Sequence, residues 1–435
     1  VGGVCEVGGL RPEAESTRHQ CYAASMRTPI TSIVCLTSAA IFAIASLASA
    51  GYDTLRDFME ALVEQGQVVG CMAEVTRNGD VTFLDAFGSY SPDSETPLGI
   101  DAVVRIYSMT KPITSLAAMI LAEEGKLSLD DPVSKYIPEF ADVKVATWPD
   151  GAAKTRENAV MRPPSRPIMV RDLLVHTSGL GYRFSVPPEY ESWYANIWTK
   201  ATTLEEAAKY MAAVPLVHDP GTAFLYGINT DVLGRVIEVA AAQPFEDFLQ
   251  ERIFTPLQMD NTGFRPSDPK GVMPIVRRSD ETGELEIEGT HFAGDEPSDN
   301  SYLPLGGEGL YSTLHDYTRF CLVMLGEGEL DGTRIVTPRT VHYMTHNHLA
   351  PNIKASDLYF GMGVSTSDAV QTAYGPRGLG RYGWGGAACT YFFVDPSQDL
   401  TAVFATQLRP FNADLGKAFP AAVLESVASE EATQP

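Results

Sequence analysis

The chain has 435 residues and a formal net charge of −23, from 32 Lys and Arg against 55 Asp and Glu. Its 44% hydrophobic and 20% charged residues are typical of a globular protein with a sizeable core, which excludes a disordered or fibrous chain. The acidic excess also argues against a nucleic-acid partner, because phosphate binding relies on a basic surface.

The first fifty residues resemble an export signal. An apolar run at residues 30–47 follows the positive charge of Arg27, and the small residues Ala48-Ser49-Ala50 close it. This order is typical of a cleavable signal peptide. We therefore expect residues 1–25 to be an upstream or artificial leader and residues 26–50 to be a signal peptide. The mature protein is expected to be exported by a bacterium, periplasmic or secreted, without stable membrane association after cleavage.

The next elements along the chain form a helix and a hairpin. Apolar residues recur at helical spacing over residues 54–64, which predicts a helix. Strands are predicted at residues 68–76 and 81–87, because Asn78-Gly79 between them tolerates the positive φ of a tight hairpin turn.

A third segment, residues 108–124, has apolar residues on one face and is followed by Gly125, which predicts a buried helix. Two polar stretches, residues 142–167 and 265–301, lack periodicity and are expected to be surface loops. The same patterns predict helices at 203–213, 230–242 and 313–325, and strands at 390–394 and 400–406. This order favours a sheet built from both ends of the chain, with a helical domain inserted between them.

The sequence does not favour a metal or cofactor site. Three cysteines beyond residue 50 lie in apolar segments, which is typical of small core residues: Cys71, Cys321 and Cys389. The spacing of His342, His346 and His348 can bind zinc, but no motif places an acidic or cysteine partner beside them. The segment Gly306–Gly309 lacks the residues of a phosphate-binding loop and is interpreted as a turn. We therefore expect no metal and no other cofactor.

The pattern Ser108-Met109-Thr110-Lys111 opens the predicted buried helix and indicates nucleophilic chemistry. Three-residue spacing puts Ser108 and Lys111 on one helix face, within reach of each other. A helix start favours developing negative charge at the serine, and a partly neutral lysine can take the serine proton. A second Ser-x-x-Lys copy at residues 267–270 contains a proline and is interpreted as chance. The Gly-x-Ser-x-Gly motif is absent, and His176 is interpreted as a structural loop histidine rather than a triad member.

Five segments follow one another in the order Arg105–Lys111, Leu173–Leu180, Pro220–Tyr226, Gly307–Thr313 and Trp384–Gly386. Together, over residues 52–430, they resemble the motifs of the serine β-lactamase and penicillin-binding-protein superfamily, in its class C-like branch. The triplet Trp384-Gly385-Gly386, and Tyr226 five residues before Asp231, are similar to the family VIII carboxylesterases. The resemblance implies an α/β fold with an antiparallel sheet flanked by helices. Residues 51–112 and 300–435 would form the α/β domain, and residues 113–299 a mainly helical domain.

The resemblance also implies roles for individual residues. Ser108 would be the nucleophile, Lys111 its proton-accepting partner, and Tyr226 the group that shuttles a proton to the leaving group. The backbone N–H groups of Ser108 and Ala387 would form the oxyanion hole. Trp384-Gly385-Gly386 would bind the substrate, in the place of the Lys-Thr-Gly motif of lactamases.

Two departures from the lactamase pattern favour an esterase. Asn229 lies one residue later than the asparagine of Tyr-x-Asn, and Trp384 replaces the lysine that holds a substrate carboxylate. We therefore predict a serine carboxylesterase that hydrolyses short-chain acyl esters of small molecules through an acyl-enzyme, with weak cephalosporin hydrolysis as a side activity. The alternatives are an acyltransferase, a class C-like β-lactamase or D-amino-acid peptidase on the same fold, and a catalytically silent binding protein.

Overall fold

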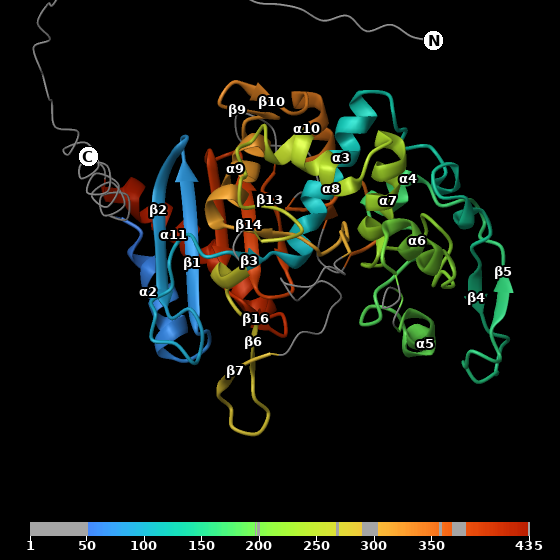
Figure 1. Cartoon of the computed structure of the whole chain (residues 1–435), viewed down its shortest axis with the longest axis horizontal. Coiled ribbons are helices and arrows are strands. Elements are labelled where there is room, and N and C mark those ends of the chain that lie inside the picture. The colour runs from blue at the N-terminus through green and yellow to red at the C-terminus, as the bar shows by residue number, and fades with distance from the viewer. Residues whose placement is uncertain are drawn as a thin grey trace, which may run out of the picture. The chain divides into compact units, whose positions relative to one another are not determined.

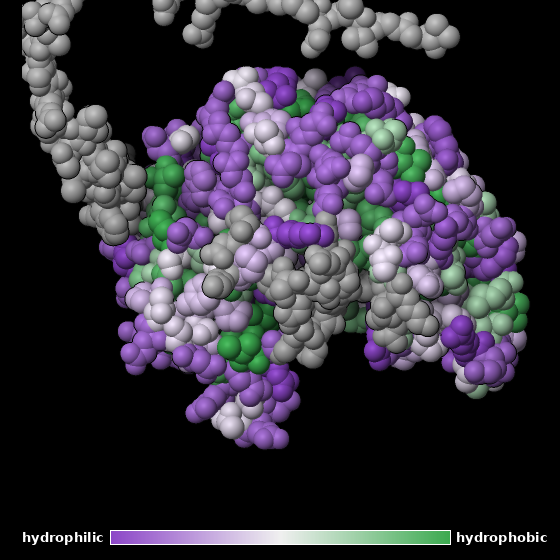
Figure 2. All heavy atoms as spheres, viewed as in Figure 1, coloured by the Kyte–Doolittle hydropathy of each residue, from purple (hydrophilic) through white to green (hydrophobic). Residues whose placement is uncertain are grey.

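A computed structural model describes residues 51–195, 197, 201–266, 269–288, 303–355, 359–367 and 380–433 (Figure 1). The predicted leader and signal peptide at residues 1–50 lie outside this range, as does Ser267 of the second Ser-x-x-Lys copy. Within the described residues, no helix has both the length and the apolarity needed to cross a bilayer. The face in Figure 2 is mainly hydrophilic, with hydrophobic residues gathered in small patches.

A seven-stranded antiparallel sheet forms the centre of the molecule, in the order β11-β12-β13-β14-β15-β1-β2. Its strands are β1 (Gly70–Arg77), β2 (Asp80–Gly88), β11 (Tyr359–Phe360), β12 (Ser365–Thr366), β13 (Tyr382–Gly386), β14 (Thr390–Asp395) and β15 (Leu400–Ala405). Strand β1 pairs with β15, so the first and last long strands meet, as predicted. Asn78 and Gly79 join β1 to β2 with φ values of 54° and 87°, which confirms the predicted turn.

Helices cover both faces of this sheet, which confirms the predicted fold class (Figure 1). Helices α2 (Asp53–Glu64) and α11 (Ala413–Thr433) pack on one face, where Phe419 lies against Phe393 and Phe404. Helix α9 (Leu314–Leu325) packs on the other face, against β1, β14 and β15. The three cysteines are free and buried, as expected of core residues.

Six further α-helices of the described residues lie between β2 and α9 in the chain, and a seventh, α10 (Pro338–Thr345), follows α9. The six are α3 (Thr110–Glu123), α4 (Val170–Leu174), α5 (Glu191–Tyr194), α6 (Leu204–Ala212), α7 (Asn229–Ala241) and α8 (Phe245–Leu249). Every residue of α3 from Thr110 to Leu121 is buried, as predicted, and α3 packs against α7. The helix begins later than predicted, because Tyr107–Met109 form a 3₁₀ turn ahead of it.

The prediction of two unstructured surface loops was partly wrong. Residues 142–167 contain the hairpin of β4 (Val145–Thr147) and β5 (Val160–Arg162), and residues 265–301 contain β6 (Val276–Arg278) and β7 (Leu285–Ile287). Strands of three residues are too short to show an alternating pattern in the sequence. The other short strands are β3 (Val104–Arg105), β8 (Tyr311–Ser312), β9 (Glu329–Leu330), β10 (Thr333–Arg334) and β16 (Leu408–Arg409). The predicted domain boundaries stay a prediction.

Candidate active site

Ser108 lies in the 3₁₀ turn between β3 and α3, between the buried residues Tyr107 and Met109. Tyr107 has a φ of 42°, in the left-handed region that a bulky residue rarely adopts. Such a conformation costs about 1–3 kcal/mol and persists only where the surrounding contacts impose it. Ser108 itself is partly exposed, so the turn presents its side chain at the surface of the pocket described below.

Lys111 is fully buried, and its Nζ contacts three oxygen atoms. Nζ donates to Ser108 Oγ at 3.0 Å, to the Gly307 carbonyl at 2.7 Å and to Tyr182 Oη at 3.1 Å. A buried polar group is costly unless it is hydrogen-bonded, and these three oxygen atoms satisfy Nζ. The structure therefore brings Ser108 and Lys111 together and holds the lysine firmly beside the serine.

A buried carboxylate, that of Asp231 on α7, lies behind this lysine. Tyr182 Oη donates to Asp231 Oδ2 at 3.2 Å, and the Gly307 N–H donates to Oδ1 at 2.8 Å. Burial raises the pKa of Asp231, and the positive charge of Lys111 opposes this effect. Burial, with the nearby Asp231 charge, holds the pKa of Tyr182 well above its usual range, so Tyr182 stays a neutral phenol. Tyr182 and Gly307 thus connect the lysine to its counter-charge.

Sequence reasoning missed the roles of Tyr182, Asp231 and Gly307. Tyr182 follows the Leu173–Leu180 motif by two residues, and Asp231 enters the family resemblance only through its spacing from Tyr226. Gly307 was interpreted as part of a turn, and the structure does place residues 306–308 in a turn. The one available signal was an aspartate among apolar residues of α7, since an ionisable residue in such a segment needs a partner.

Tyr226 lies over the lysine, in the loop before α7. Its ring centroid is 4.8 Å from Lys111 Nζ, and Trp384 Nε1 lies 3.4 Å from its hydroxyl oxygen. The rings of His176 and Trp384 pack against it, with centroids 4.8 Å and 5.5 Å away. The structure therefore gathers Ser108, Lys111, Tyr226 and Trp384 at one place.

His176 and Asn229 form a buried support beneath the tyrosine loop. Asn229 Nδ2 lies 2.9 Å from His176 Nδ1 and donates to the Leu180 carbonyl at 3.0 Å, while Ser178 Oγ donates to Asn229 Oδ1. Burial, with the Lys111 charge, holds the pKa of His176 well below its usual range, so the imidazole is neutral. This environment fits the structural role expected for the histidine, and Asn229 is fully buried and engaged in these contacts.

Strand β13 forms the opposite wall of the site. A Cβ on Gly386 would lie 2.4 Å from the Ile106 carbonyl oxygen and 2.2 Å from Thr390 Oγ1, so only glycine lets β13 approach the serine turn this closely. Ala387 follows directly and lines the same pocket as Ser108, and the oxyanion hole of these two residues stays a prediction.

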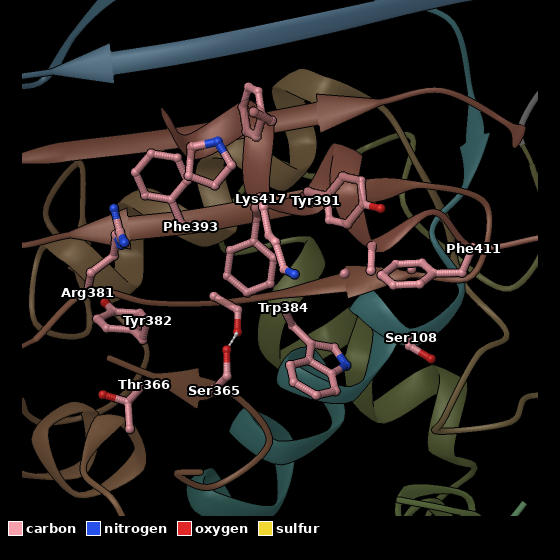
Figure 3. A pocket seen from close by; sticks show the side chains of 18 of the residues that line it. Ser108, Ser365, Thr366, Arg381, Tyr382, Trp384, Tyr391, Phe393, Phe411 and Lys417 are labelled. Atoms are coloured by element: carbon pink, nitrogen blue, oxygen red, sulfur yellow. Dashed lines mark hydrogen bonds between the residues drawn. The ribbon is translucent and has the colours of Figure 1, made fainter. Parts of the chain in front are cut away.

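The pocket beside Ser108 has a volume of about 590 Å³ and a largely apolar wall. Trp384 and Phe411 line it beside the serine, and Lys417 and Arg381 extend it away from the serine (Figure 3). Gly383 and Gly385 of β13 also line it and leave room because they carry no side chain. A cavity of this size can hold a small organic molecule.

The described residues contain no group of three or more His, Cys, Asp or Glu side chains that could hold a metal ion. Among the histidines with zinc-like spacing, His346 Nδ1 contacts the His342 carbonyl and His348 Nε2 lies 2.6 Å from the Tyr343 carbonyl oxygen. Two of the three imidazoles are therefore engaged with the backbone.

A serine beside a buried lysine, facing strand β13 of an antiparallel sheet, defines this protein as a serine hydrolase of the β-lactamase and penicillin-binding-protein fold. The family model described as Beta-lactamase matches residues 55–425, and the chain belongs to that family. This match and the relatives below confirm the predicted resemblance to family VIII esterases.

Two relatives are named as esterases. The chain is 30% identical over 384 residues to a lovastatin esterase of Penicillium rubens, covering 82% of this chain and 93% of that protein. It is 28% identical over 367 residues to esterase EstB of Burkholderia gladioli, covering 80% and 88%. A solved structure described as EstCE1, a hydrolase with promiscuous acyltransferase activity, matches with a TM-score of 0.72 at 26% identity, over 88% of this chain and 99% of that one. These relatives support a serine hydrolase or acyltransferase activity on small-molecule esters.

Proposed function

We propose that the protein is a serine carboxylesterase that hydrolyses short-chain acyl esters through an acyl-enzyme on Ser108. The observation that carries this proposal is the 3.0 Å hydrogen bond between Lys111 Nζ and Ser108 Oγ at the wall of an apolar pocket. The esterase names of two relatives support the reaction class.

In the proposed acylation step, Lys111 acts in its free-amine form: Ser108 Oγ attacks the ester carbonyl and its proton passes to the lone pair of Lys111 Nζ. The negative charge that develops on the carbonyl oxygen is stabilised by the backbone N–H groups of Ser108 and Ala387. Tyr226 then supplies a proton to the leaving alkoxide and regains one from Lys111, whose ammonium lies 4.8 Å from its ring centroid. Water attacks the acyl-enzyme in the second half, and the proton transfers run in reverse.

A labelling experiment tests the nucleophile. Intact-mass analysis after treatment with a fluorophosphonate should give one adduct on the wild-type protein and none on Ser108→Ala. Hydrolysis of p-nitrophenyl butyrate by Ser108→Ala should fall by about a thousandfold or more, because residues that act as one catalytic unit depend on one another. Lys111→Ala and Tyr226→Phe should be nearly as damaging. Labelling that persists in Ser108→Ala contradicts the assignment.

Acyl transfer is the second candidate, and the activity stated for the EstCE1 structure favours it. An alcohol would replace water in the attack on the acyl-enzyme, without any change in the groups that handle protons. Product analysis with p-nitrophenyl butyrate and added 1-butanol separates the two reactions. Formation of butyl butyrate in excess over butyrate, at alcohol concentrations far below that of water, would assign the protein as an acyltransferase.

Weak cephalosporin hydrolysis is proposed as a side activity. Trp384 lines the pocket where lactamases carry a cation, and Asn229 is engaged with His176. A charge-assisted bond to a substrate carboxylate contributes about 1.5–3 kcal/mol, so its loss weakens recognition by about one to two orders of magnitude. The value of kcat/KM for p-nitrophenyl butyrate should therefore far exceed that for benzylpenicillin. Equal values would show that another group holds the lactam carboxylate.

Export remains part of the proposal. Residues 26–50 are proposed to direct the protein across the bacterial inner membrane and to be removed, with a mature start near Gly51. N-terminal sequencing of protein recovered from a periplasmic fraction tests this. A full-length membrane-bound form would contradict it.

A further inference from the structure

The pocket is more than a binding site for a neutral acyl group. Among the described residues that line it, two are cationic, Arg381 and Lys417, and none is Asp or Glu. This bias stands against the composition of the chain, in which acidic residues outnumber basic ones by 55 to 32. A positive lining in a protein of charge −23 focuses a local field that attracts anions.

Within the part of the chain that the structure describes, the two cations have no competing carboxylate partner. No Asp or Glu side chain of the described residues forms an ion pair with either of them, and Asp414, on the same helix as Lys417, is no exception. Arg381 stacks on the ring of Phe393, with its guanidinium carbon 5.6 Å from the ring centroid. That contact fixes the position of the guanidinium without neutralising its charge.

The space between the cations and the nucleophile is apolar. Trp384, Tyr391 and Phe393 line the pocket, together with Phe411, which is 49% exposed at its wall. In Figure 3, Ser108 and Arg381 lie on opposite sides of the pocket, with Lys417 and Trp384 between them in the view. A bound molecule that contacts both sides would therefore present an ester at Ser108, an apolar body, and an anionic group at the other end.

We infer that the preferred substrates are amphiphilic esters with a carboxylate remote from the ester bond, bound by Lys417 and Arg381. This inference rests on the proposed esterase function and names its substrate class. It is compatible with poor binding of β-lactams, because their carboxylate lies close to the reacting carbonyl and not at the far side of an apolar body. The carboxylate can belong to the acyl half or to the alcohol half of the ester.

Two sets of matched esters distinguish a carboxylate in the acyl half from one in the alcohol half. The first contains mono-p-nitrophenyl esters of straight-chain diacids from four to ten carbons, each compared with the p-nitrophenyl ester of the monoacid of equal length. The second compares the acetate ester of 4-hydroxyphenylacetate with that of 4-ethylphenol. The wild-type protein should prefer the anionic member in one of the two sets.

Lys417→Gln and Arg381→Gln should each lower kcat/KM for the preferred anionic esters by about fivefold, and the double variant by about tenfold or more, with a clearly smaller effect on p-nitrophenyl butyrate. Lys417 is the decisive position because it is exposed and its replacement leaves the core intact. Arg381→Lys, which keeps the charge, should retain most of the preference. Lys144→Gln, at an exposed lysine outside the pocket lining, is the matched control and should change neither class of ester.

The outcomes are separable. If the wild-type protein hydrolyses p-nitrophenyl butyrate but Lys417→Gln and the double variant treat anionic and neutral esters as the wild type does, the anion site is refuted and the esterase stands. If the wild-type protein does not hydrolyse p-nitrophenyl butyrate, the proposed function itself fails.

Discussion

Replacement of Asp231 by asparagine tests whether the buried carboxylate serves the catalytic lysine. Asp231 accepts hydrogen bonds from Tyr182 at 3.2 Å and from the Gly307 N–H at 2.8 Å, and both donors' residues also contact Lys111. An asparagine keeps one acceptor oxygen and loses the other, so one of these two buried donors loses its acceptor. A buried donor left unsatisfied costs about 1–3 kcal/mol.

Two measurements test the effect of losing this carboxylate. Chemical denaturation should show Asp231→Asn to be less stable by about 1–3 kcal/mol at pH 7. Hydrolysis of p-nitrophenyl butyrate should fall as well, because Tyr182 and Gly307 then lack the carboxylate that orients them around Lys111.

Controls separate this role from a general packing defect. Asp316→Asn replaces another buried aspartate, which accepts bonds from Asn261 and Thr262 and not from the lysine network. It should cost stability without a matching loss of activity. The double variant Lys111→Met, Asp231→Leu should recover stability relative to Lys111→Met alone, while staying inactive. An Asp231→Asn protein with wild-type stability and wild-type activity would refute the reasoning.

Three further predictions concern the sheet and the pocket. Burial raises the pKa of Glu74 to about 7 in the folded protein, so the folded state favours the protonated carboxyl group. The stability that this preference contributes in acid is therefore lost as the pH rises to about 7. Glu74→Gln should therefore raise stability by up to about 3 kcal/mol at pH 8 and by little at pH 4, measured by denaturation at both values. Gly386→Ala should lower kcat at least tenfold, since its Cβ would meet the Ile106 carbonyl oxygen at 2.4 Å, whereas Gly263→Ala, with 3.6 Å of clearance, should not. Trp384→Lys should narrow the gap between p-nitrophenyl butyrate and nitrocefin, and an unchanged ratio would remove Trp384 from substrate selection.

The sequence predicts the elements whose information is local. The hairpin turn follows from Asn78-Gly79, and α3 follows from its apolar face. The Ser108–Lys111 pair follows from three-residue spacing, because helical geometry alone brings those side chains together. The short hairpin of β4 and β5 was missed, since three-residue strands carry too little pattern.

The rest of the site depends on contacts between distant parts of the chain. Lys111 meets Tyr182 across 71 residues and Gly307 across 196, and no local pattern encodes these meetings. Asn229 illustrates the same limit: its one-residue displacement is visible in the sequence, but its bond to His176 emerges only after α4 and α7 pack together.

The pairing of β1 with β15 has a consequence for the time at which the enzyme becomes competent. Thr76 and Thr401 share a 2.6 Å hydrogen bond across 325 residues of sequence, so the sheet closes only after almost the whole chain has been synthesised. Ser108 and Lys111 leave the ribosome early, whereas the wall that carries Trp384 and Ala387 arrives near the end. A nascent chain thus carries the proposed nucleophile without the opposite wall of its pocket, so the site stays incomplete during translation. Such non-local closure is slow, because distant strands pair only after the long stretch of chain between them has folded back.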